Sequence, residues 1–333
     1  MRRLILAAAL LGVACQNPVD KAAKARIFSP EDPPKFVTRA ADDLGPSHLN
    51  DSAEHIKRVF TMSALEAAER LGPHQVKSAL EFRWSGAGSK SELDEVHTLT
   101  IGSHGDFAAR LDAGDRLGDS KQGMEMIRAQ GRVFARSRFQ KFRERTRDRG
   151  AADRYEQEVY DVLGTLYELV DGRVALSPEG EDTVAGRKVY KYRVVLAEKT
   201  PALDDGPKLP PLATPKGGYD AHLKAEQLLS QKREPRTLSG TLSVDAQTAV
   251  PLAARLEGTV DAPGEGNDHA SLHLLVDTSV PKVGADLVVA APKDVAVDAD
   301  RPQSIAAALE RFDLPRAATR ADGGADAEDD EDK

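Results

Sequence analysis

Few residues of this 333-residue chain combine the types and the spacing that chemistry requires. Two histidines, His269 and His273, lie four positions apart on a predicted strand and share a face with Asp277. Such a set is a conceivable metal site, but this face is the polar side of a half-exposed strand, where solvated side chains are far more frequent than ligands. The sequence contains no Gly-x-Ser-x-Gly elbow and no His-Glu-x-x-His motif. We therefore expect no enzyme activity, no metal and no cofactor.

The single cysteine, Cys15, follows an N-terminal segment that has three zones. Residues 1–3 carry positive charge, Leu4–Gly12 are apolar, and Val13–Ala14 are small, which together are typical of a secretory signal. Because Cys15 follows directly, the segment resembles a bacterial lipoprotein signal. That family usually has a leucine three positions before the cysteine, where this chain has Gly12. The alternative is a plain secretory signal followed by a chance cysteine.

The resemblance implies that residues 1–14 are removed and that Cys15 becomes acylated. Two or more acyl chains hold a protein stably on a membrane, whereas one chain holds it only marginally. In lipoproteins of Gram-negative bacteria an aspartate directly after the cysteine commonly marks retention in the inner membrane. This chain has Gln16 there, so the resemblance implies the periplasmic face of the outer membrane. Without a second cysteine, the domain has to fold without disulfides.

The composition favours one large folded domain with flexible ends. A net charge of -8 and an aromatic content of 5% argue against nucleic-acid binding. We expect a flexible tether at 15–52, which contains five prolines, and one folded domain at 53–282 with a proline-rich insertion at 199–218. Beyond the domain we expect an extension at 283–312 that contains a short helix, and a disordered acidic tail at 313–333.

Two hydrophobic periods alternate along the expected domain. Apolar residues recur with a helical period at 53–71 and at 151–170, so each segment is predicted to form a helix. Elsewhere apolar and polar residues alternate with a period of two, which is typical of half-buried strands. The predicted strands span residues 76–86, 93–101, 106–111, 123–129, 132–142, 173–176, 186–196, 237–245, 251–260 and 269–280. The glycines at 86 and 88 predict a hairpin turn.

This order of elements, behind a lipoprotein signal, resembles the half-barrel of the LolA and LolB carriers and of the mycobacterial LppX and LprG lipoproteins. The segments that carry the resemblance are 184–187, which lead into Tyr190 and Tyr192, and 239–245, which are followed by 250–252. The match covers roughly residues 55–280. It implies an α+β fold in which helices cover the concave face of a curved antiparallel sheet.

In proteins of that kind the sheet encloses a hydrophobic cavity that holds acyl chains. The resemblance therefore implies a lipid or an acylated protein as the ligand. The candidate cavity residues are Leu80, Phe82, Trp84, Tyr190, Tyr192, Leu242 and Leu256. The alternative is an ordinary sheet core that is packed by the helix at 151–170, and it is the more common environment for any one of these residues.

A basic run in this acidic protein predicts a second candidate surface. The residues concerned are Arg136, Arg138, Lys141, Arg143 and Arg145. They are suited to anionic lipid headgroups, and Phe139 and Phe142 within the run favour contact. The alternative is a charged edge strand that prevents aggregation.

Two hypotheses on function follow. The first is a membrane-anchored carrier or chaperone that binds a lipid or an acylated protein. The second is an envelope sensor or assembly factor that uses the same fold as a protein-interaction module, as regulatory relatives of the RseB type would allow. An enclosed apolar cavity would favour the carrier, and a tightly packed sheet would favour the interaction module.

Overall fold

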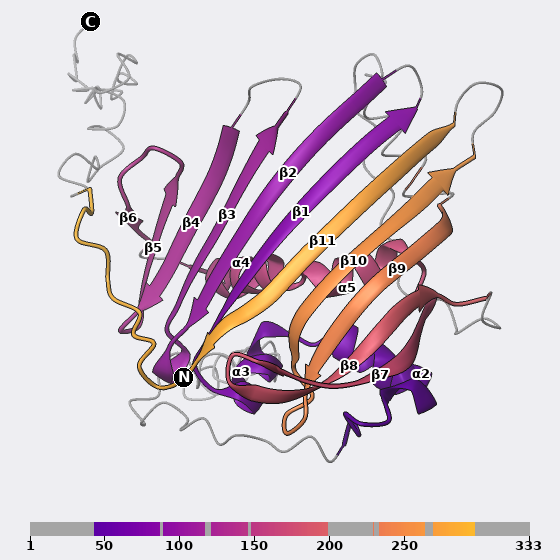
Figure 1. Cartoon of the computed structure of the whole chain (residues 1–333). Coiled ribbons are helices and arrows are strands. Elements are labelled where there is room, and N and C mark those ends of the chain that lie inside the picture. The colour runs from indigo at the N-terminus through magenta and orange to yellow at the C-terminus, as the bar shows by residue number, and fades with distance from the viewer. Residues whose placement is uncertain are drawn as a thin grey trace, which may run out of the picture.

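The computed structural model describes residues 43–86, 89–116, 121–145, 148–198, 229, 233–263 and 269–296 (Figure 1). The strands of this part are β1 (His74–Gly86), β2 (Ser89–Ile101), β3 (Phe107–Asp115), β4 (Lys121–Ala129), β5 (Arg132–Ser137), β6 (Arg143–Glu144), β7 (Val174–Val184), β8 (Arg187–Leu196), β9 (Glu234–Asp245), β10 (Pro251–Ala262) and β11 (Ala270–Val283). The helices are α2 (Ala53–Phe60), α3 (Ala64–Leu71), α4 (Ala151–Tyr160) and α5 (Val162–Leu169), with 3-10 turns η1 (Leu49–Asp51) and η2 (Ser103–Gly105).

Within these residues the strands form one antiparallel sheet in the order β6-β5-β4-β3-β2-β1-β11-β10-β9-β8-β7. The sheet is curved and open, and the helices lie on one face of it (Figure 1). We call this face the concave face. The predicted α+β class, with helices covering a curved antiparallel sheet, is confirmed. The predicted hairpin between β1 and β2 is also present, because their pairing continues to Gly86 and Ser89.

Each of the two predicted helices is in fact a pair of helices. The segment 53–71 breaks after α2 because the Ser63 hydroxyl accepts a hydrogen bond from the Glu66 amide at 3.1 Å and starts α3 as an N-cap. The segment 151–170 breaks at Asp161, whose ψ of 39° is not helical. The Asp161 carboxylate occupies space that a Cβ at Gly164 would need. The first break has a capping hydrogen bond, the second coincides with the non-helical backbone at Asp161, and both leave the apolar period intact.

Several strands differ by a few residues from their predicted bounds, and two differ most. The strand predicted at 132–142 ends at Ser137, where the chain reverses through a turn in which Phe139 has a φ of +66°. In contrast, β7 extends eight residues beyond the predicted end at Leu176. It is an edge strand whose second half is exposed, so the alternation that marks a half-buried strand is missing there.

Residues 43–52, which we call the strap, lie against the core ahead of α2. Leu44 and Leu49 in the strap are fully buried at 0% exposure. The part of the expected tether that is nearest to the domain is therefore packed in the structure.

The remaining expectations fall outside the described residues. These are the signal at 1–14 with Cys15, the tether at 15–42, the insertion at 199–218, the short helix predicted within 283–312 and the acidic tail at 313–333. Among the described residues, none of the helices has both the length and the apolar character that crossing a membrane requires.

Candidate functional site

The register of the sheet brings all seven candidate cavity residues to the concave face. Residues two positions apart on a strand point to the same face and lie about 7 Å apart along it. The cross-strand rows are Trp84 with Leu272 and Val260; Phe82 with Leu274; Leu80 with Val276 and Leu256; Tyr192 with Leu242 and Ala254; and Tyr190 with Val244. Together with these cross-strand partners, the candidates form a continuous apolar strip across β1, β11, β10, β9 and β8.

Four of the seven candidates belong to a densely packed part of this face, which we call the closed end. Its members are Leu80, Tyr192, Leu242 and Leu256, each with 4% exposure or less, and they share one hydrophobic cluster with residues of α2, α3, α4 and α5. Tyr190 packs against the same cluster and is partly buried. The Tyr192 hydroxyl donates a hydrogen bond to the Pro46 carbonyl of the strap at 2.5 Å. The strap and the helices therefore cover the closed end.

A small cavity lies at the closed end, between the helices and the sheet. Its volume is about 20 Å³, and it is lined by Val59, Phe60, Met62, Val76, Tyr160, Asp161, Leu163, Pro251 and Thr278. A space of this size holds about one water molecule. Burial raises the pKa of the Asp161 carboxyl to about 6. The cavity is therefore water-sized and mostly apolar, with Asp161 and Thr278 among its few polar lining residues.

The remaining two candidates lie at the other end of the strip, which we call the Trp84 end. Phe82 and Trp84 pack against a second hydrophobic cluster made of Leu229, Val260, Ala262, Ala270 and Leu272. Leu169, at the end of α5, also packs against this cluster. Figure 1 shows that β1, β10 and β11 continue past α4 and α5 at this end. Phe82 and Trp84 each keep part of their surface exposed to solvent.

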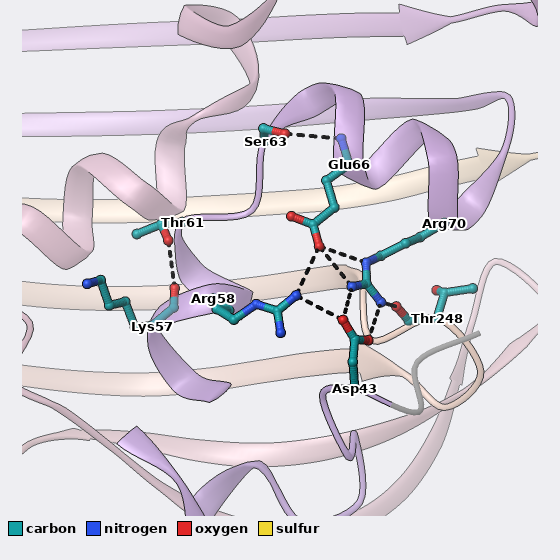
Figure 2. A network of polar contacts seen from close by, with 8 residues as sticks. All are labelled: Asp43, Lys57, Arg58, Thr61, Ser63, Glu66, Arg70 and Thr248. Carbon is teal, nitrogen blue, oxygen red and sulfur yellow. Dashed lines mark hydrogen bonds and ion pairs between the residues drawn. The ribbon is translucent and has the colours of Figure 1, made fainter. Parts of the chain in front are cut away.

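An ion cluster built around the buried Arg70 fastens the strap to the helices and to the β9–β10 turn (Figure 2). The Arg70 side chain on α3 is fully buried and donates from both terminal nitrogens to the Asp43 carboxylate, at 2.9 and 3.1 Å. It also donates to Glu66 at 2.8 and 3.0 Å, and to the Thr248 carbonyl at 3.4 Å. Arg58 on α2 approaches Asp43 at 2.9 Å and Glu66 at 3.6 Å. Two arginines and two carboxylates thus neutralise one another.

The electrostatics of this cluster favour its charged form. Hydrogen bonds from Arg70 hold the pKa of the Asp43 carboxyl well below its usual range. Burial alone would lower the pKa of Arg70, but its hydrogen bonds to Asp43 and Glu66 outweigh burial and raise it. Sequence reasoning did not find this cluster. Its one local signal is the spacing of four between Glu66 and Arg70, which is also typical of an exposed helix pair.

The five predicted basic residues lie on β5, in the turn that follows it, on β6 and directly after β6. Three have acidic partners: Arg136 with Glu125 at 2.6 Å, Arg138 with Asp112 at 3.4 Å, and Lys141 with Asp294 at 3.3 Å. Arg143 and Arg145 are exposed and have no acidic partner within the described ranges. The structure thus joins these residues on one edge of the sheet.

The histidine pair considered as a metal site lies at β11. His273 contacts Glu257 on β10, with 2.8 Å between the ring Nε2 and the carboxylate. Over the part of the chain that the structure describes, no three His, Cys, Asp or Glu side chains gather closely enough to hold a metal ion.

Comparisons with known proteins give structural matches alone. No protein-family model matches the sequence, and no curated protein matches it. A crystal structure of MucB in complex with MucA(peri) matches with a TM-score of 0.23 and 18% identity over 73% of this chain. The match spans 59% of that MucB chain. A Pseudomonas aeruginosa MucA/MucB complex matches with 18% identity and a TM-score of 0.20, covering 73% of this chain and 64% of that one.

Lipoprotein structures are also among the matches. The Mycobacterium tuberculosis lipoprotein LppX has 14% identity and a TM-score of 0.22, over 69% of this chain and 98% of that one. A LolA superfamily protein from Nitrosomonas europaea has 8% identity and a TM-score of 0.19, over 66% and 92%. LppX and LolA are both among the proteins whose half-barrel fold the order of elements resembles. Similarity at this level concerns the fold alone.

Proposed function

We propose that this chain is a lipid-anchored protein of the bacterial envelope that binds an acyl chain at the Trp84 end. The acyl chain would belong to a lipid or to an acylated protein. The observation that carries this proposal is the partly exposed apolar surface of Phe82 and Trp84, which border the buried cluster on β10 and β11 beyond α5. Such a surface favours an apolar ligand because its burial removes that surface from water.

The anchor in this proposal is Cys15, at the periplasmic face of the outer membrane. Its support is the sequence alone: a charged start, an apolar stretch and a small pair lead directly to the single cysteine, and Gln16 follows it. No catalytic step is part of the proposal.

The test uses Trp84, which is the only tryptophan and lies in the proposed site. A doxyl-labelled fatty acid is titrated into the full chain, purified without detergent, and tryptophan fluorescence is measured. The nitroxide quenches only at short range, so binding at this site should give quenching that saturates. Phe82→Glu should abolish it, because the carboxylate resists transfer out of water. Val96→Glu is the matched control, because Val96 is 51% exposed on β2.

A second candidate function is favoured by the closed end. Leu80, Tyr192, Leu242 and Leu256 are packed against helices, as in an ordinary core. A protein-interaction module of the envelope needs no internal ligand site. If wild-type Trp84 shows no saturable quenching, or if Val96→Glu abolishes quenching as well as Phe82→Glu does, the acyl-binding proposal fails and the interaction module becomes the better hypothesis.

A further inference from the structure

Phe139 is the most exposed large hydrophobic residue of the described chain, at 89% exposure. It lies in the turn between β5 and β6, within residues 138–141, which we call the basic turn. Its φ of +66° is in the left-handed region, which bulky side chains rarely adopt. Such a backbone at an exposed aromatic residue is a feature that the surrounding structure has to maintain.

The surrounding structure does hold this turn in place. The Gln140 amide donates to the Ser137 carbonyl at 3.0 Å, and the Arg138 amide donates to Gly123 at 2.8 Å. Directly after the turn, Phe142 is buried at 5% exposure in a cluster with Ile127, Ala129 and Phe134. The backbone of Phe142 also exchanges hydrogen bonds with residues 294 and 296. Phe139 is therefore presented outward on a supported base.

Cationic side chains flank this aromatic tip. The Arg138 guanidinium lies 5.0 Å from the centre of the Phe139 ring, and Lys141 is 68% exposed at the other side of the turn. Arg143 on β6 and Arg145 directly after it have no acidic partner within the described residues. An exposed ring beside long cationic side chains is the combination that anionic membrane surfaces bind.

We propose that the basic turn inserts Phe139 into the interface of an anionic lipid bilayer, with Arg138, Lys141, Arg143 and Arg145 contacting the headgroups. Phe139 is 89% exposed, so a fluid lipid surface can close around its ring, whereas an acidic protein would have to supply a matching pocket. The proposal does not rest on acyl binding at the Trp84 end, because β5 and β6 lie at the far side of β1 from β11.

The test places a fluorescent reporter at the tip of the turn. The full chain carries Cys15→Ala to remove acylation and Trp84→Phe to remove the native signal, and Phe139→Trp supplies the reporter. With vesicles of phosphatidylglycerol and phosphatidylethanolamine, its emission should shift to the blue, and brominated phosphatidylglycerol should quench it. Phosphatidylcholine vesicles should bind at least tenfold more weakly. Arg143→Gln and Arg145→Gln should each weaken binding roughly fivefold.

A matched control separates insertion from any other association with the vesicles. Val96→Trp in the same background places the reporter at a side chain that is 51% exposed on β2, and neither a blue shift nor quenching is expected there. Equal quenching at both positions, or none at residue 139, would overturn the proposal. A blue shift at residue 139 with an acidic peptide such as polyglutamate, and none with vesicles, would also overturn it and identify a protein partner.

Discussion

The two ends of the concave face use the same kinds of side chain to different effect. At the closed end, Tyr192, Leu242 and Leu256 are at most 1% exposed beneath helices and the strap. At the Trp84 end, Phe82 and Trp84 continue the same strip on β1 but keep part of their surface in water. The difference comes from what covers each end. Apolar residues on one face of a sheet therefore specify a surface, and the elements above it decide whether that surface is core or site.

The largest expected loss of stability comes from a charge introduced at the closed end, compared with a charge at the Trp84 end. Tyr192→Glu should destabilise the fold by about 4 kcal/mol or more, because a carboxylate would be buried without a partner. Phe82→Glu should cost roughly half as much, because the carboxylate can stay partly solvated. Urea unfolding of both variants measures the difference. Equal losses would mean that the Trp84 end is packed as densely as the closed end.

The next effect tests the strap as a cover of the closed end. Leu49→Ala should destabilise by about 3 kcal/mol, the usual cost of removing a buried leucine side chain, because Leu49 is 0% exposed. Leu65→Ala, at a side chain that is 47% exposed on α3, should cost well under half of that. Thermal unfolding of the pair is the measurement. Similar losses for the two variants would show that the strap adds little to the closed end.

Arg70, the buried member of the ion cluster, should contribute more to stability than Arg58 does. Arg70→Met should destabilise by roughly 2 kcal/mol, because it removes every hydrogen bond that joins Asp43 to α3. Protease cleavage within the strap should become faster at the same time. Arg58→Met should cost less than about 1 kcal/mol, because Arg58 is 37% exposed. Unchanged cleavage of the strap in Arg70→Met would refute the fastening role of the cluster.

The last effect depends on pH and concerns His74, at the start of β1. His74 is 0% exposed, and its ring Nδ1 lies 2.7 Å from the Gly72 carbonyl. Burial lowers its pKa to about 4, against 6.5 for the unperturbed side chain. The unfolded chain therefore takes up a proton before the folded one does, and stability is lost as the pH falls from 6.5 towards 4. Between pH 7 and pH 5 this loss is roughly 2 kcal/mol.

His74→Gln provides the comparison for this pH effect. The variant lacks the imidazole. The difference in stability between wild type and variant should therefore change by roughly 2 kcal/mol between pH 7 and pH 5. Measuring this difference cancels other groups such as Asp161, whose raised pKa of about 6 acts in the opposite direction. A difference that does not change with pH would show that His74 is hydrated in the folded protein.

Much of the fold could be predicted from the sequence because its signals are local. Alternating residues such as Leu272, Leu274 and Val276 on β11 identified a half-buried strand and its inward face. The helical period identified both covering segments, although each is interrupted locally, at Ser63 and at Asp161. The candidate cavity residues could be predicted from the same alternation, because residues of one parity on paired strands share a face.

What the sequence by itself determined is therefore which residues face inward and which segments are helical, together with a single cysteine behind an apolar start. Only the tertiary structure decided that Tyr192 lies in a closed core while Trp84 keeps part of its surface in water. It also decided that Arg70 meets Asp43 from 27 residues away and that Phe139 projects from its turn. The physical reason is that periodicity is set by the geometry of one element, whereas burial depends on which other elements pack above it.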